Sequence, residues 1–119
     1  MNYIPPRSIT EHDKPISELY RLAAMEHVKA ERKARELEEG KSIVISEMMN
    51  KLCEEDEKLS QAKAERTAKG SDQYKSYIRR MHDARTEANL RKVDAEVLKM
   101  QHGEFLMFSA AARDERRLG

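Results

Sequence analysis

The sequence predicts an all-α protein in which two long helices form an antiparallel, coiled-coil-like hairpin. No proline follows Pro15, and proline is the residue that most strongly interrupts a helix. Apolar residues recur at every third or fourth position, the spacing that gathers them on one face of a helix. The high charged fraction of 38% and the mean hydropathy of −0.88 are typical of long helices rather than of a globular core.

The predicted domain organisation is an N-terminal arm over residues 1–14, expected to be flexible, followed by one helical hairpin domain over residues 15–119. Pro15 suits the first turn of the first helix, where its missing N–H has no partner to lose. Gly40 leaves two alternatives for that helix. Either the helix continues through the glycine, which the unchanged apolar spacing favours, or it breaks there and the domain has three helices.

The predicted turn of the hairpin lies at residues 69–72, where Lys-Gly-Ser-Asp is the only mid-chain cluster of turn-forming residues. Gly70 suits the left-handed conformation that ends a helix. Ser71 or Asp72 then supplies a side-chain oxygen to cap the next helix. A fold symmetric about Gly70 pairs Leu52 with Ala88, and Leu37 with Phe105.

The second helix carries two apolar stripes. The first stripe includes Tyr77, Ala84, Ala88 and Ala95 and is expected to face the first helix. The second stripe begins later along the helix and has no partner within a two-helix hairpin. With a phenylalanine pair beside it, it predicts a contact with another copy or another protein, formed by Leu90, Val93, Val97, Met100, Phe105, Met107 and Phe108.

The segment from Phe105 to Ala112 is apolar on nearly all sides, which is unusual for a surface helix. Three interpretations remain open from the sequence. The segment forms a core layer against the start of the first helix, contacts another subunit, or binds a membrane surface.

Basic residues cluster around the predicted turn, and Lys69, Lys75, Arg79 and Arg80 are candidates to contact an anion or a nucleic acid. Cations at the end of the first helix complement its dipole, which accounts for Lys69 without a ligand. The others open the second helix, where the dipole favours acidic residues. The net charge of +1 excludes a global basic field, so any such binding is expected to be local.

Nothing in the sequence predicts an enzyme, a cofactor or a metal site. The acidic residues 54–57 are consecutive on a helix and therefore point in different directions. The four histidines do not have the spacing of a metal-binding motif. Cys53 has acidic neighbours, which disfavour a reactive thiolate.

The expected location is the cytoplasm. No signal peptide or membrane span is predicted from the sequence. The single Cys53 excludes an internal disulfide and is compatible with a reducing compartment.

Three segments, LEEGKSI (37–43), YI (77–78) and ARTEAN (84–89), resemble small uncharacterised helical proteins of phages and prophages. The resemblance covers most of the chain from Leu19 onward. It implies the cytoplasm of a phage-infected host, and it implies no functional residues.

The predicted function is a non-enzymatic helical scaffold or protein-interaction module that self-associates. The alternative is a nucleic-acid accessory protein, of the kind used in phage replication or recombination, which binds through the basic turn.

Overall fold

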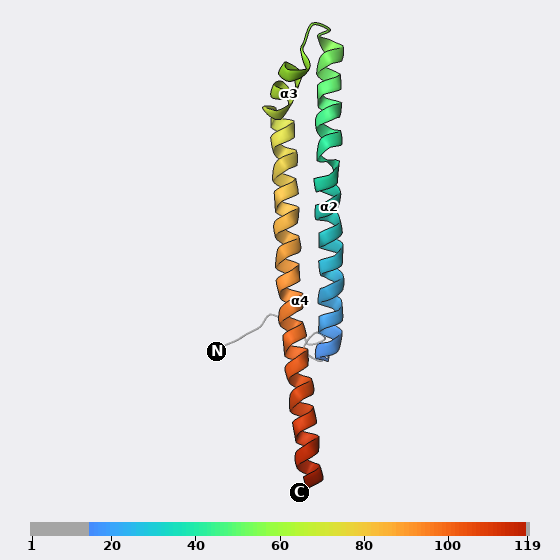
Figure 1. The fold of residues 1–119 in the computed structure, drawn as a ribbon, viewed down its shortest axis with the longest axis vertical. Helices are drawn as coiled ribbons and strands as arrows, with labels where there is room; N and C mark the ends of the chain where they lie inside the picture. Colours follow the sequence, from blue (N-terminus) through green and yellow to red (C-terminus); the bar gives the residue numbers. More distant parts are fainter. Residues whose placement is uncertain (1–14, 119) are drawn as a thin grey trace. The chain divides into compact units, whose positions relative to one another are not determined.

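The computed structural model describes residues 15–118, and helices make up nearly all of this range. Three helices follow one another: α2 (Ile16–Glu55), α3 (Gln61–Lys69) and α4 (Asp72–Leu118) (Figure 1). The described residues contain no strand. The prediction of an all-α fold is therefore confirmed. The predicted arm over residues 1–14 lies outside the described residues.

The chain divides into two compact units, each built from antiparallel helix segments. The middle unit is Lys29–Ala88, and the terminal unit combines residues 15–28 with residues 89–118. Helices α2 and α4 each contribute a segment to both units.

Helix α2 continues through Gly40 without a break, as the apolar spacing indicated. A Cβ atom at this position would lie 3.0 Å from the hydroxyl oxygen of Tyr77. That hydroxyl donates a hydrogen bond of 2.5 Å to the backbone carbonyl of Leu37. The missing side chain of Gly40 therefore gives the tyrosine of α4 access to the backbone of α2.

The chain reverses at residues 56–60, so the predicted turn at residues 69–72 is wrong. Helix α2 ends at Glu55, and the carboxylate of Asp56 then accepts a hydrogen bond of 3.1 Å from the backbone N–H of Lys58. Ser60 caps α3 by accepting a 3.2 Å bond from the N–H of Lys63. Both bonds are typical of turn and N-cap residues, although the sequence here contains neither glycine nor proline.

Gly70 joins α3 to α4 without reversing the chain. Its backbone has φ −85° and ψ −6°, a right-handed conformation rather than the expected left-handed one, and its N–H donates to the carbonyl of Arg66. Ser71 bridges the junction, since its hydroxyl donates to the carbonyl of Ala68 and accepts from the N–H of Tyr74. Figure 1 shows α3 and the first turns of α4 on the same side of α2.

The earlier reversal changes every predicted helix pairing. Ala88 packs in one cluster with Ala34 and Ala84, not beside Leu52. Leu37 contacts Tyr77 through its carbonyl, not Phe105. The pairing symmetric about Gly70 is therefore wrong, because it assumed that α3 belonged to the first arm of the hairpin.

The core of the middle unit consists almost entirely of alanine. Ala34, Ala64 and Ala88 are fully buried, and no large apolar side chain among the described residues is. Small side chains let helices approach closely, but each of them removes little apolar area from water. Packing alone therefore contributes less stability here than in a core of leucine or phenylalanine.

Ion pairs link α2 to α4 beside this alanine cluster. The guanidinium of Arg85 contacts Glu31 at 2.8 Å and, through two nitrogens, both carboxylate oxygens of Glu38 at 2.6 and 2.8 Å. The hydrogen bonds that Arg85 donates to Glu38 lower the pKa of Glu38, and the bonds that Arg85 donates to Glu38 and Glu31 raise its own pKa. This two-bond geometry requires a defined position of the helices relative to each other.

The terminal unit brings the start of α2 against the later part of α4. The rings of Tyr20 and His102 lie 6.5 Å apart between centroids, and Ala95 is buried. Nδ1 of His102 is buried and has no hydrogen-bond partner among residues 15–118. Ile16, Leu19 and Leu98 border a groove that also touches Phe105 and Phe108.

The Arg85–Glu38 pair predicts a specific loss of stability in acid. The pKa of Glu38 in the folded protein lies below its ordinary value of 4.5. Ionised Glu38 therefore contributes its full stabilisation above pH 4.5, and this contribution disappears as the pH falls through the pKa of the folded protein. Glu38→Gln should therefore show a smaller decrease in Tm between pH 6 and pH 3 than the wild type. Glu39→Gln, which changes an exposed neighbour, should follow the wild-type curve. Equal pH dependence in all three proteins would contradict the assignment.

The contact of Gly40 with Tyr77 predicts non-additive mutations. Gly40→Ala gains about 1 kcal/mol of helix propensity and displaces a hydroxyl whose bond contributes about 1 kcal/mol, so its net effect should be near zero. In a Tyr77→Phe background no hydroxyl is displaced, and the same change should stabilise by about 1 kcal/mol. Urea unfolding of the four proteins measures this coupling, and simple additivity would show that the two residues do not interact.

Candidate interaction surface

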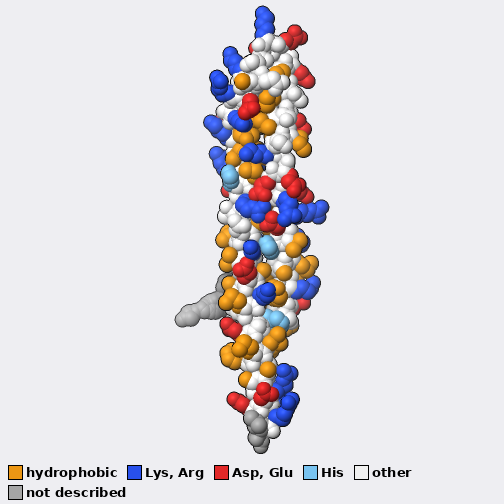
Figure 2. Space-filling model, viewed as in Figure 1, with side chains coloured by type: hydrophobic (Ala, Val, Ile, Leu, Met, Phe, Trp, Pro, Cys, Tyr) orange, Lys and Arg blue, Asp and Glu red, His pale blue; other side chains and the backbone are white. Residues whose placement is uncertain are grey.

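Exposed large apolar side chains gather in the terminal unit. With the exception of Ile43, every large apolar residue found exposed among the described residues belongs to residues 25–28 or to residues 90–108. Figure 2 shows hydrophobic side chains, coloured orange, exposed at the surface of the molecule. A concentration of exposed apolar groups marks a contact surface more often than isolated residues do.

Six residues of α4 form a continuous line that we call the outer seam. They follow one another by alternating steps of three and four residues, the pattern of positions a and d in a coiled-coil heptad. All six are exposed, and the apolar members range from 47% exposed at Val97 to 72% at Met107. The outer seam consists of Leu90, Val93, Val97, Met100, Glu104 and Met107.

The outer seam lies on the side of α4 that faces away from α2. Ala95 is 7% exposed and marks the side of α4 that is covered within the terminal unit. Val93 and Val97 are each two residues from it, a rotation of about 160–200° around a helix of 3.6 residues per turn. In the terminal unit, α4 therefore has one face on α2 and an opposite apolar face in solvent.

Phe105 and Phe108 were predicted to join this contact, and the structure places them at its margin. They border the groove next to Ile16 and Leu19 of α2, yet they remain 55% and 73% exposed. The apolar segment from Phe105 is thus neither a closed core layer nor fully separate from α2.

The predicted basic candidates do not lie at the chain reversal. Lys69 forms an ion pair of 2.9 Å with Glu65, which raises the pKa of Lys69. The guanidinium of Arg80 lies 5.4 Å from the centre of the Tyr77 ring, within the range of a cation–π contact. The reversal instead carries the exposed acidic residues 54–57, so the expected basic tip is wrong.

Of the four basic candidates, Lys75 and Arg79 have no ionic or cation–π contact within residues 15–118. Both are exposed, and neither forms an ion pair with any residue in the range 15–118. They are four residues apart on α4 and therefore share a face of the helix.

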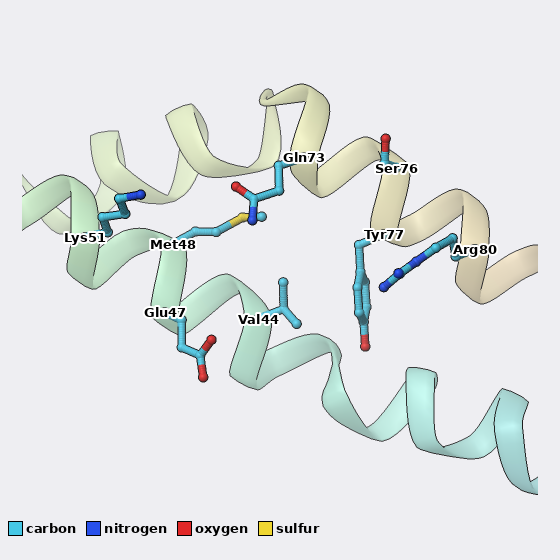
Figure 3. Close-up of a pocket in the computed structure, with 8 residues that line it drawn as sticks. All are labelled: Val44, Glu47, Met48, Lys51, Gln73, Ser76, Tyr77 and Arg80. Atoms are coloured by element: carbon cyan, nitrogen blue, oxygen red, sulfur yellow. The ribbon is translucent and has the colours of Figure 1, made fainter.

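A groove of about 680 Å³ lies between α2 and α4 in the middle unit. Figure 3 shows Val44 and Met48 on one side, Gln73 on the other, and the Tyr77 ring beside Arg80. No sequence pattern indicated this groove, because its existence depends on which turns of α2 and α4 meet. Its charged lining residues are Glu47 and Lys51 on α2 and Arg80 on α4.

Three further observations on residues 15–118 concern metal ligands, membrane spans and the free thiol. No group of three or more histidine, cysteine, aspartate or glutamate side chains lies close enough there to hold a metal ion. No helix in this range has the length and apolar character needed to cross a membrane. Cys53 is a half-buried free thiol.

Comparisons with protein-family models, with curated proteins and with solved structures found no match to this chain. The resemblance to helical phage proteins thus stays a prediction from the sequence.

Proposed function

We propose that the protein is a self-associating helical interaction module and that the outer seam of α4 is its contact surface. The single observation that carries the proposal is the exposure of large apolar side chains at five of the six heptad positions of the outer seam. A helix stripe of this kind is stable in water when a second helix covers it.

The composition of the core supports the same proposal. The seven buried residues in the described range are six alanines and Tyr74. A small helical protein usually needs many buried leucines or aromatic residues, or an additional partner, to be stable. The large side chains that would supply this apolar area belong instead to the outer seam, so association adds the burial that the protomer lacks.

The proposed setting is the cytoplasm. The free thiol of Cys53 is compatible with a reducing compartment. A phage-infected host rests only on the sequence resemblance.

Disrupting the centre of the outer seam should separate the subunits. Val97→Glu places a charge between Val93 and Met100 at the centre of the seam and should weaken association by about a hundredfold or more, because each copy would bury an unpaired carboxylate there. Light scattering across a concentration series measures the effect. Ile43→Glu is the matched control, since Ile43 is similarly exposed but lies outside the seam; it should leave the oligomer intact. A wild-type mass of 13.8 kDa at tens of micromolar would refute self-association.

A second candidate function is nucleic-acid binding, which the exposed and unpaired cations Lys75 and Arg79 favour. Two such cations contribute phosphate contacts whose strength falls with salt. The double variant K75E/R79E should abolish retardation of short DNA or RNA duplexes at low salt. The control K41E/K92E makes the same charge change at exposed lysines elsewhere and should retain binding. Absence of any salt-sensitive retardation by the wild type would exclude this candidate.

A further inference from the structure

The proposed self-association leaves open the direction in which two outer seams meet. We infer that the partner is a second copy of this chain whose α4 runs antiparallel, with the contact centred between Val97 and Met100. This inference rests on the proposed function and adds the orientation and the register. It comes from the placement of one charged residue and one glycine in the terminal unit.

Glu104 opposes a parallel arrangement. It occupies a heptad position within the outer seam, between Met100 and Met107. In a parallel, in-register pair each seam residue faces its own counterpart. Glu104 would then meet Glu104 of the second copy inside an apolar contact, where two like charges repel and lose hydration.

An antiparallel arrangement removes this conflict and preserves the apolar layers. Positions a then face positions d of the other helix, so Val97 faces Met100 of the second copy, and Leu90 faces Met107. Glu104 faces Val93, and each of these three pairings occurs twice by symmetry. The methylene groups of Glu104 can cover the valine while its exposed carboxylate stays in water.

The edges of the antiparallel contact are free of like-charge pairs. Glu96 lies opposite Gly103 of the second copy, and Asp94 lies opposite Gln101. In the protomer a Cβ atom on Gly103 would meet no atom within 4 Å. A glycine inside a helix costs about 1 kcal/mol relative to alanine, and no contact within the protomer requires one here. In the antiparallel pair its missing side chain leaves room for Glu96.

Disulfide cross-linking distinguishes the two directions. In a full-length Cys53→Ser background, L90C and M107C are prepared separately and mixed under mild oxidation. The antiparallel pair should give disulfide dimers only in the mixture, because positions 90 and 107 face each other. Two L90C copies would then be about 25 Å apart along the helix axis, at 1.5 Å per residue, and a disulfide needs Cα atoms within about 7 Å.

Charge substitutions at Gly103 provide a second readout with a built-in control. G103K and G103E both replace a helix-weakening glycine, but only the lysine would attract Glu96 of the second copy. Dimers of G103K should therefore dissociate at about three- to tenfold lower concentration than dimers of G103E. Adding E96K should reverse that order. In a parallel pair position 103 does not face position 96, and no reversal would occur.

The outcomes separate this inference from the proposed function. Heterotypic cross-links together with the reversed charge preference support the antiparallel contact. If the protein associates and the L90C sample forms disulfide dimers by itself, the antiparallel orientation is refuted. The proposed self-association would still stand. An oligomer that forms none of these cross-links refutes the seam contact itself. A monomer at all concentrations refutes both.

Discussion

The close contact between α2 and α4 depends on side chains that are almost all alanine. Ala34 meets Ala84 and Ala88 in the middle unit, and Ala95 is buried in the terminal unit. Larger residues at these positions would force the helices apart, since interiors are packed too densely to absorb added volume. The same small residues bury little apolar surface. The constraint that allows close packing therefore also leaves the protomer with few apolar contacts of its own.

Polar contacts determine which turns of α2 and α4 pair, because contacts between alanines do not distinguish one pairing from another. Alanine side chains resemble one another, so a shifted pairing of two alanine-rich helices would pack almost equally well. The bond from Tyr77 to the carbonyl of Leu37, and the bonds from Arg85 to Glu31 and Glu38, form at one pairing only. Exposed ion pairs add little stability, but they make the alternative pairings less favourable.

Helix α4 divides its side chains between two opposite faces in the terminal unit. Small residues such as Ala95 face α2, and the valines and methionines of the outer seam face outward. This division is the basis of the proposal that α4 binds another helix. The one acidic member of the outer seam, Glu104, is the basis of the antiparallel orientation proposed above.

The sequence by itself determined the helical content and the existence of a second apolar stripe from Leu90 to Met107, and it favoured a helix that continues through Gly40 without excluding a break there. These features follow from local spacing, because periodicity specifies which residues share a face. Only the tertiary structure decided where the chain reverses and which turns of α2 and α4 meet. The reversal at residues 56–60 uses Asp56 and Ser60 as capping groups without a glycine, whereas Gly70 takes a right-handed conformation that its sequence context did not reveal. The groove beside Tyr77 and the bonds of Arg85 depend on which turns of α2 and α4 pair. Local sequence patterns therefore could not predict them.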